Sequence, residues 1–378
     1  MKPKLRFKEF SDEWCETTLG ETTTFKQGIQ VDVDKQFSEP FDNSVRFIRI
    51  VDYTQNTKDI RYISKPANAN YVDEHDVVLV RYGATAGFVG HGIKGVIANN
   101  MFTVTPNSNL NKDFLYTILK QDKIYNKLNS SNGSSAMPAL NFGSVSILKF
   151  SYPSIDEQNK LTNLINLLDK KIELQTKKIE DLKLFKSYTK NQLFNNGEKV
   201  VKLKDILIKW NEKNKDGSID YVESISNKYG FISQSDQFED RNVASKDLKN
   251  YYVIRKNVFG YNPSRLNVGS LALKENDNTS VVSPLYECFT TTQNNKFMLE
   301  WFDSKYFRKG TLSKFEGGVR NTLNFTNLCE IEINLPPLDK QNKFANYLYN
   351  FDKRIQLEEL KLNKLNMMKK GLMQNMFV

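Results

Sequence analysis

The residue types that most often carry out catalytic or metal chemistry are scarce in this 378-residue chain. It has two histidines, His75 and His91, and three isolated cysteines, Cys15, Cys288 and Cys329. Two histidines are too few for most hydrolytic triads or histidine-based metal centres, so we predict no catalytic residue and no metal site. An odd number of scattered cysteines argues against a disulfide framework and indicates a cytoplasmic protein.

Enzymes that modify or cut DNA carry motifs for which this sequence offers poor matches. Residues 262–264 (Asn-Pro-Ser) come nearest to the Asn/Asp-Pro-Pro-aromatic loop of adenine methyltransferases, without the second proline or the aromatic residue. The acidic pairs at 73–74 and 239–240 are not followed by the Glu-x-Lys strand of a metal-dependent nuclease. The glycine-rich segment 83–92 fits neither the Walker loop nor the dinucleotide fingerprint. We therefore predict that the chain binds and does not catalyse.

The charge and the loops suit a nucleic-acid partner. With 54 basic and 44 acidic residues the net charge is +10, and this excess favours a polyanion. Several loops combine glycine with arginine, asparagine, serine and aromatic residues, a mixture that suits hydrogen bonding to base edges. The candidate DNA-binding residues are Arg81, Ser134, Ser135, Met137, Tyr261, Asn262, Arg265, Gly317, Gly318, Arg320 and Asn321.

Two long helices are expected to position these loops. Residues 153–194 and 336–377 align without a gap at a constant offset of 183 positions, with Pro153 matching Pro336 and Phe194 matching Phe377. Apolar residues alternate at spacings of three and four, which is typical of a coiled-coil seam. A helix of about 38 residues is about 57 Å long. The residues expected to pair the helices are Ile165, Leu168, Ile172, Gln175 and Ile179 with Leu348, Phe351, Ile355, Glu358 and Leu362.

Such narrow apolar stripes are best buried if the two helices pack on each other. We expect an antiparallel pair with an internal pseudo-two-fold, in which Gln175 and Glu358 lie close together. The alternative that each is a long surface helix of an ordinary domain stays open. No run of 18 apolar residues that would span a membrane occurs.

The repeat extends back from the helices into globular sequence. Leu140-Asn141-Phe142 matches Leu323-Asn324-Phe325 at the same offset, whereas the sequence between such anchors differs. Residues 77–83 and 251–262 each predict a strand. The fold class we predict is α+β, with two globular α/β domains separated by the paired helices. The expected boundaries are domains at 1–150 and 198–334 and helices at 151–197 and 335–378.

These features together resemble the specificity subunit of type I restriction–modification systems. The resemblance is carried by residues 5–14 (LRFKEFSDEW), by the Pro-x-x-Asp-x-Gln helix starts at Pro153 and Pro336, and by the two Leu-Asn-Phe segments. It implies that residues 1–150 and 198–334 are two target-recognition domains, each of which reads half of a gapped site in double-stranded DNA. It also implies helices that set the spacing and bind two methyltransferase subunits, through which restriction and translocase subunits join. S-adenosylmethionine, ATP and Mg²⁺ would belong to those partners.

Three other interpretations remain open on the residues alone. The chain could be a stand-alone regulator that bridges two DNA sites without enzyme partners. It could be an enzyme with an unrecognised active site, or a coiled-coil adaptor that binds no DNA.

Overall fold

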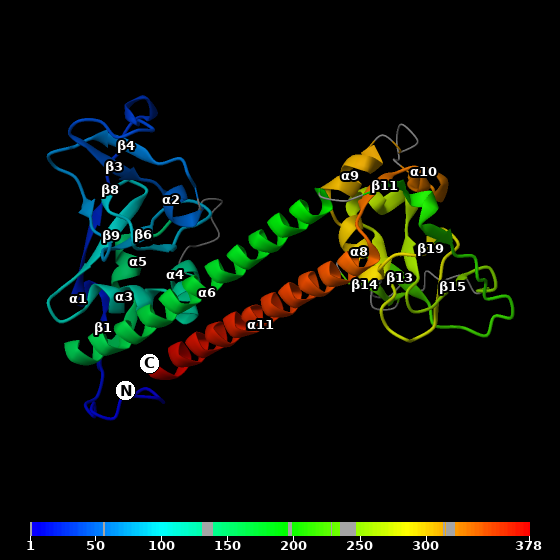
Figure 1. The fold of residues 1–378 in the computed structure, drawn as a ribbon. Helices are drawn as coiled ribbons and strands as arrows, with labels where there is room; N and C mark the ends of the chain where they lie inside the picture. The colour runs from blue at the N-terminus through cyan, green and yellow to red at the C-terminus, as the bar shows by residue number, and fades with distance from the viewer. Residues whose placement is uncertain are drawn as a thin grey trace. The chain divides into compact units, whose positions relative to one another are not determined.

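The computed structural model describes residues 2–55, 57–130, 139–195, 199–227, 229–234, 247–312, 314 and 322–378. It divides into two compact units. Unit 1 comprises Met1–Thr176 with Lys361–Val378, and unit 2 comprises Lys177–Leu360. Each unit contains one globular domain and a part of both long helices (Figure 1). We call the globular parts domain 1 (residues 2–154) and domain 2 (residues 199–337).

The two long helices are present as predicted, α6 over Ile155–Asn195 and α11 over Leu338–Met376. Proline precedes each start, at Pro153 and at Pro336 and Pro337, where it interrupts no hydrogen bond within the helix. The interior of α6 holds neither proline nor glycine, and α11 has a single glycine, Gly371, near its end. No proline therefore interrupts the backbone hydrogen bonds of either helix.

Within each unit the segments of α6 and α11 run antiparallel, which confirms the predicted direction. In unit 2 the partners of Lys178 and Lys186 are Glu358 and Asp352, at 2.9 and 2.7 Å, so the numbering falls in α11 as it rises in α6. In unit 1 Asp169 forms an ion pair with Lys369. That pair is related to Lys186–Asp352 by the repeat offset of 183 positions.

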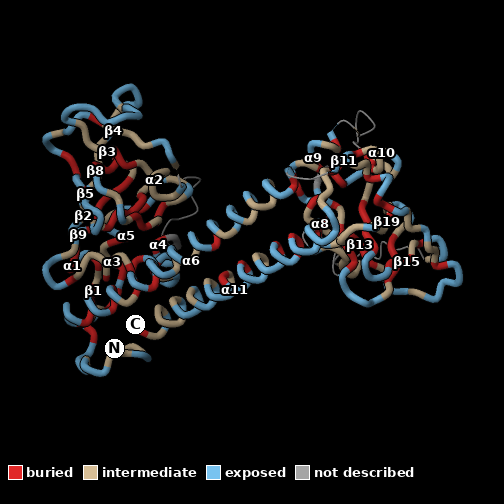
Figure 2. Tube along the Cα trace, viewed as in Figure 1, coloured by how far each residue is buried: buried red, intermediate tan, exposed pale blue. Residues whose placement is uncertain are grey.

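The predicted seam residues are buried or half-buried, and Figure 2 shows buried stretches alternating with exposed ones along the long helices. Glu358 is buried and pairs with Lys178, one helical turn after Gln175. Direct proximity of Gln175 and Glu358 stays a prediction. The buried seam residues are Ile165, Leu168, Ile179, Leu348, Ile355 and Glu358, and the half-buried ones are Ile172, Gln175, Phe351 and Leu362.

Domain 1 is built on two four-stranded sheets. The first is antiparallel with the order β2-β9-β6-β7, and the second has the order β4-β3-β8-β5 with β3 and β8 parallel. A separate pair joins β1 (Cys15–Thr18) to β10 (Lys149–Tyr152). The bounds in the first sheet are β2 Thr23–Gln27, β9 Met101–Pro106, β6 Val77–Val80 and β7 Val89–Gly90. Those in the second are β4 Arg61–Ser64, β3 Ser44–Ile48, β8 Gly95–Ile97 and β5 Tyr71–Val72.

The position of strand β6 explains why every residue in it is apolar. Successive side chains of a strand point to opposite faces. Val77 and Leu79 belong to the core beneath helix α3 (Lys112–Leu119), whereas Val78 and Val80 belong to the core of the second sheet. The strand is therefore buried between two cores. The helices of domain 1 are α1 Leu19–Thr22, α2 Ile50–Thr54, α3 Lys112–Leu119, α4 Asp122–Ser130, α5 Phe142–Ser146 and the 3-10 turn Val33–Lys35.

Domain 2 repeats the first sheet of domain 1 with the order β12-β19-β16-β17. Its remaining strands form separate pairs, β13 with β14 and β15 with β18, while β11 pairs with β20. The strands are β11 Lys199–Lys202, β12 Leu207–Lys209, β13 Glu223–Ser226, β14 Gly230–Ser233, β15 Tyr252–Ile254, β16 Phe259–Tyr261, β17 Leu271–Leu273, β18 Ser280–Val282, β19 Glu287–Thr291 and β20 Glu332–Leu335. Among the described residues of this domain the helices are α8 Asn295–Phe302, α9 Lys305–Leu312, α10 Phe325–Cys329 and the 3-10 turns Leu203–Asp205 and Pro263–Val268.

The strand predicted at 251–262 is divided into β15 and β16. Asn257 lies between them with a φ of 71°, a left-handed conformation that asparagine tolerates better than most residues. The chain turns there, so that β15 pairs with β18 and β16 joins the central sheet. One predicted strand thus supplies two separate sheets.

A buried glutamine fixes the start of each long helix. The Oε1 atom of Gln158 accepts from the backbone N–H of Asn111 (2.8 Å), and its Nε2 donates to the carbonyl of Pro153 (2.8 Å). Asn111 is the N-cap of α3, with a side chain that accepts from the N–H of Phe114. The bonds therefore join the start of α6 to the start of α3. Both ends of a buried amide are satisfied.

The same arrangement recurs in domain 2. Gln341 accepts from the N–H of Asn294 at 3.1 Å and donates to the carbonyl of Pro336 at 2.8 Å. Asn294 is the N-cap of α8. The Pro-x-x-Asp-x-Gln motif is therefore explained by its glutamine, which attaches each helix to its domain.

The far end of each long helix packs into the domain of the other repeat. Phe377 of the second repeat stacks on Phe114 of domain 1, with ring centres 5.8 Å apart. Phe194 of the first repeat contacts Phe297 of domain 2 at 5.5 Å. Both phenylalanines are buried. The core of each domain is thus completed by a residue from the other half of the sequence.

Candidate functional site

The candidate site in each domain lies where the central strand ends. In domain 1 the carbonyl of Arg81, just after β6, accepts from the N–H of Leu140 (2.9 Å). In domain 2 the carbonyl of Pro263, just after β16, accepts from the N–H of Leu323 (3.1 Å). The predicted residues Ser134, Ser135, Met137, Gly317, Gly318, Arg320 and Asn321 lie outside the described residues. Leu140 and Leu323, which follow these two predicted segments in the sequence, therefore lie beside the ends of β6 and β16.

Arg81 is held firmly at this place in domain 1. Its Nη1 donates to Oε1 of Gln27 (2.8 Å) and its Nε donates to the carbonyl of Leu140 (3.3 Å). The guanidinium carbon is 4.9 Å from the ring centres of both Tyr82 and Phe142. Aromatic contacts and two hydrogen bonds fix the plane of the half-buried cation. A fixed guanidinium is suited to planar, hydrogen-bonded recognition of a base or a phosphate.

Amide side chains surround Arg81, and sequence reasoning missed them. Gln27 donates from Nε2 to the carbonyl of Asn99 (2.7 Å), and the amide of Asn99 donates to Gln30. Gln30 is exposed, and glutamine and asparagine are the usual partners of adenine edges. We call Gln27, Gln30, Arg81, Tyr82 and Asn99 the strand-end surface of domain 1.

Gly28 is the feature of the sequence that could have indicated the strand-end surface of domain 1. A Cβ atom on Gly28 would lie 2.2 Å from the carbonyl oxygen of Ala98, so only glycine allows the chain to pass so closely. Two glutamines, at 27 and 30, flank this tight approach directly after β2. Polar amides beside an obligatory glycine at a strand end would have indicated the site.

The three predicted residues of domain 2 that the structure describes, Tyr261, Asn262 and Arg265, differ in how far they are exposed. Arg265 is exposed, and the side-chain oxygen of Asn262 accepts from the N–H of Ser264 (3.0 Å), which caps the 3-10 turn. Tyr261 is fully buried, and its ring packs against Phe289 at 6.2 Å. Burial raises the pKa of the Tyr261 phenol above its ordinary value. The expected DNA contact by Tyr261 is therefore corrected to a packing role.

A lysine contacts the phenylalanine of the Leu-Asn-Phe segment at the strand end of domain 2. The ammonium of Lys209 lies 4.7 Å from the ring centre of Phe325, in the Leu-Asn-Phe segment. In domain 1 the matching Phe142 contacts the guanidinium of Arg81 and also stacks on Phe25, with ring centres 5.6 Å apart. Lys209 also forms an ion pair with Glu287, and burial lowers the pKa of its ammonium. We call Lys209, Asn262, Ser264, Arg265 and Glu287 the strand-end surface of domain 2.

One group in domain 2 resembles a catalytic set but is closed to substrate. The ammonium of Lys274 and the hydroxyl of Ser280 both contact Oε2 of Glu223. All three residues are buried, with 0% of Lys274 exposed. A serine that has a basic neighbour can be a nucleophile only if substrate reaches it. The group is therefore a buried, paired charge that supports the core.

Metal-ligating side chains gather at one place within the described parts of the chain. His75, His91 and Asp113 of domain 1 have ligand atoms that all lie within 4.8 Å of one another. Sequence reasoning missed this group, because it counted the two histidines and did not ask whether the fold brings them together. Over the described residues, no helix has both the length and the apolar character to cross a membrane.

Known proteins share this architecture. A solved structure of the type I restriction–modification S subunit from M. genitalium superposes with a TM-score of 0.60 at 13% identity, covering 100% of this chain and 99% of that one. A chain from a study of complex assembly and conformational transition in the type I R-M system gives 0.55 at 13% identity, covering 95% and 96%. These likenesses show the fold.

Sequence relatives agree with the fold. The type I restriction enzyme MjaVIII specificity subunit of Methanocaldococcus jannaschii is 22% identical over 340 residues, which cover 80% of this chain and 78% of that protein. The family model described as the type I restriction modification DNA specificity domain matches twice, over residues 12–184 and 195–367. Those two matches take in both domains and most of both long helices. The chain therefore belongs to the family of type I restriction–modification DNA specificity subunits.

Proposed function

We propose that this subunit reads a bipartite, gapped site in double-stranded DNA, one half-site with each domain. The observation that carries the proposal is that the same frame occurs in both domains. The sheet order, the buried glutamine (Gln158 or Gln341) and the phenylalanine at the far end of a long helix (Phe377 or Phe194) recur, whereas the strand-end surfaces differ. Two unlike surfaces on a duplicated frame suit two unlike half-sites. Helices α6 and α11 set the gap between the half-sites, as dimer spacing does in smaller DNA-binding proteins.

The chemistry of the strand-end surfaces supports direct readout. Domain 1 offers the fixed guanidinium of Arg81 with the amides of Gln27 and Gln30. Domain 2 offers the exposed Arg265. Arginine and amide side chains make the paired hydrogen bonds that distinguish bases in the major groove, each worth about 1–3 kcal/mol of discrimination. The net charge of +10 adds attraction for phosphates that does not depend on sequence.

Exposed apolar residues on the long helices support the docking of two methyltransferase subunits. Leu174 of α6 is 56% exposed and Leu357 of α11 is 60% exposed, and the repeat offset of 183 positions relates them. The same offset relates Leu184, 71% exposed, to Met367, 74% exposed. Large apolar side chains left in water at two equivalent sets of positions suit two copies of one partner.

In this proposal the catalytic steps belong to the partners. The methyltransferase subunits bind S-adenosylmethionine and turn an adenine of each half-site out of the duplex. Restriction and translocase subunits, which use ATP and Mg²⁺, join through them. The runner-up is a stand-alone bipartite DNA-binding regulator. Tight, sequence-specific binding by the purified chain without partners would favour it.

The test of bipartite reading uses one arginine from each domain. The complex with its methyltransferase is assembled with Arg81→Ala or Arg265→Ala, and selected or methylated sequences are determined for each variant. We expect each variant to relax preference at one half-site only, with affinity reduced about 10- to 100-fold. Arg308→Ala, which changes an exposed arginine of α9, is the matched control. Loss of preference at both half-sites from one substitution would refute separate reading.

The docking surface is tested independently. Leu174→Lys or Leu357→Lys should each remove one methyltransferase from the complex, measured as mass in light scattering, and the double variant should remove both. Glu173→Lys introduces the same side chain at the neighbouring exposed position and should leave the complex intact. Full-sized complexes from the double variant would show that the docking surface lies elsewhere.

A further inference from the structure

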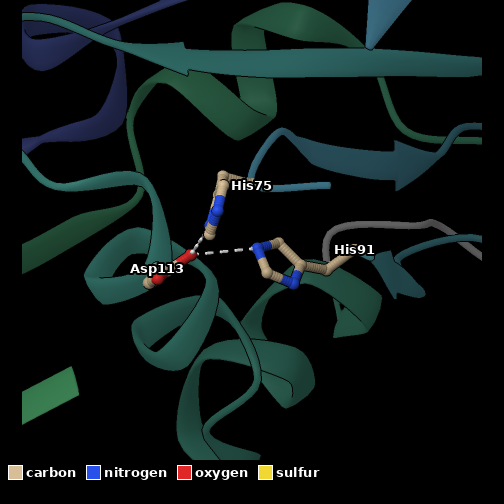
Figure 3. A group of neighbouring side chains, drawn as sticks. All are labelled: His75, His91 and Asp113. Carbon is tan, nitrogen blue, oxygen red and sulfur yellow. Dashed lines mark hydrogen bonds and ion pairs between the residues drawn. The ribbon is translucent and has the colours of Figure 1, made fainter. Parts of the chain in front are cut away.

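Both histidines of the chain converge on one carboxylate in domain 1 (Figure 3). Nδ1 of His75 is 3.0 Å and Nε2 of His91 is 3.2 Å from the same oxygen, Oδ1 of Asp113. His75 precedes β6, His91 follows β7, and Asp113 lies in the first turn of α3. Three separate segments thus aim imidazole and carboxylate groups at one point.

The spacing fits a transition-metal ion. Two ligand atoms about 2.0–2.1 Å from a tetrahedral zinc ion lie about 3.3 Å from each other. The two nitrogen–oxygen distances, 3.0 and 3.2 Å, already match this separation. The imidazole nitrogens need only a small approach, because all ligand atoms lie within 4.8 Å. The His75 side chain is 67% exposed, so a rotation of its ring can close that gap.

The surroundings hold the ligands and leave the carboxylate available. Asp73 accepts from the N–H of His75 (2.8 Å), which fixes the turn, and the ring of His91 stacks on Tyr116 at 4.3 Å. The neighbouring cation, Lys112, pairs with Asp73 and Asp76 at 3.0 and 2.6 Å. With Lys112 engaged by two carboxylates, the charge of the region is net negative. Groups of this kind that orient ligands commonly strengthen metal binding.

We propose that His75, His91 and Asp113 form a binding site for one divalent transition-metal ion of the zinc class. His75 coordinates through Nδ1, His91 through Nε2 and Asp113 through one carboxylate oxygen, and water takes the remaining position. Two imidazoles and a carboxylate suit Zn²⁺, Co²⁺ and Ni²⁺ better than Mg²⁺ or Ca²⁺, which prefer oxygen ligands alone.

The ion would have a structural role. His75 and His91 flank the first sheet of domain 1 and Asp113 belongs to α3, so coordination joins the sheet to that helix. Asn111, two residues before Asp113, is bonded to Gln158 of α6. The site precedes β6, whereas Arg81 follows it, so the ion and the strand-end surface lie at opposite ends of this strand. The ion therefore stabilises domain 1 without contacting DNA.

Domain 2 provides an internal comparison. The repeat offset of 183 positions places Lys296 where domain 1 has Asp113, and the second half of the chain contains no histidine. The ammonium of Lys296 lies 4.3 Å from the ring centre of Tyr349. A cation replaces the ligand carboxylate there. The expected stoichiometry is one ion per chain.

The test uses the full chain without a polyhistidine tag, labelled with ¹⁵N in the imidazole rings of histidine, so that the ring nitrogens of His75 and His91 are the whole spectrum. On addition of Zn²⁺ we expect large shifts of the Nδ1 resonance of His75 and the Nε2 resonance of His91, complete at one equivalent. Co²⁺ should give the visible absorption of a low-coordinate site, and Mg²⁺ should change neither signal. The melting temperature should rise with Zn²⁺.

Two variants and two controls decide the result. Asp113→Asn and His91→Ala should weaken Zn²⁺ binding more than about 100-fold, because loss even of groups that only orient ligands costs about 10- to 100-fold. Asp122→Asn, in the first turn of the adjacent helix α4, and Cys15→Ser, at an exposed thiol, should bind as the unaltered chain does. Circular dichroism confirms that each variant is folded. Absence of imidazole shifts, or unchanged affinity in Asp113→Asn, would overturn the proposal.

Discussion

Domain 1 and domain 2 are alike where they hold the long helices and unlike where they expose strand ends. The buried glutamines Gln158 and Gln341 make the same bonds to an N-cap asparagine and a proline carbonyl. By contrast, Phe142 contacts the guanidinium of Arg81 and stacks on Phe25 in domain 1, whereas its counterpart Phe325 contacts the ammonium of Lys209 in domain 2. The attachment to the helices is buried and tightly constrained by packing, whereas an exposed surface can change without disturbing it.

The largest expected effect on stability comes from removing the phenylalanine at the far end of either long helix, Phe194 or Phe377. Phe194→Ala and Phe377→Ala should each lower the free energy of unfolding by about 3–5 kcal/mol, because each empties a buried aromatic site. Hydrogen exchange followed by mass spectrometry locates the effect. Phe377→Ala should speed exchange in α3 of domain 1, and Phe194→Ala in α8 of domain 2.

The matched control for that test is Phe185→Ala. Phe185 also lies on α6 but is 51% exposed, so its loss should lower the free energy of unfolding by less than about 1 kcal/mol. If both core variants loosened the same domain, the pairing of each helix end with the other repeat would be wrong.

A smaller but sharper effect is expected from the glutamines. Gln158→Ala leaves the N–H of Asn111 and the carbonyl of Pro153 without this buried partner, so urea unfolding should show a loss of about 2–3 kcal/mol. Gln341→Ala should cost the same amount in domain 2. Gln356→Ala, at an exposed position of α11, should have almost no effect. Unequal losses from the two buried positions would break the proposed equivalence.

The smallest effect distinguishes two ion pairs related by the repeat. Lys186 contacts both Asp352 (2.7 Å) and Glu300 (3.1 Å), whereas Lys369 is paired with Asp169, and Thr117 occupies the position of Glu300. Burial opposes the charge of Lys186, but its hydrogen bonds to the two carboxylates raise the pKa of its ammonium.

Lys186→Met should therefore cost about 1–2 kcal/mol in urea unfolding, and Lys369→Met about 0.5 kcal/mol. Combining Lys186→Met with Glu300→Thr measures the extra coupling directly, as a double-mutant cycle. Equal losses from Lys186→Met and Lys369→Met would mean that Glu300 adds nothing.

The helical frame could be predicted from the sequence because its signals are local and repeated. Alternating spacings of three and four apolar residues gave both long helices and their seam, and the gapless match gave the internal symmetry. The fold within each domain was less accessible. Strands β3 and β8 pair in parallel although Phe47 and Val96 are far apart in the chain, and no local pattern specifies such pairing.

The sites were predicted less well, for identifiable physical reasons. Tyr261 was chosen for its neighbours in the sequence, yet the alternation along β16 turns its side chain into the core. Gln27 and Asn99 were missed because β2 and the turn before β9 are brought together only by the sheet. His75, His91 and Asp113 lie on three separate segments, and only the folded chain shows that they meet.

The way the units divide the chain has a consequence for the order of folding during synthesis. Unit 2 is one continuous stretch, Lys177–Leu360, whereas unit 1 joins Met1–Thr176 to Lys361–Val378. As the ribosome releases the polypeptide, the second unit can mature while the first still lacks Phe377 against Phe114 and Trp14. The domain translated first is therefore the last to close, and a transcript cut short before codon 361 would leave it exposed to proteases.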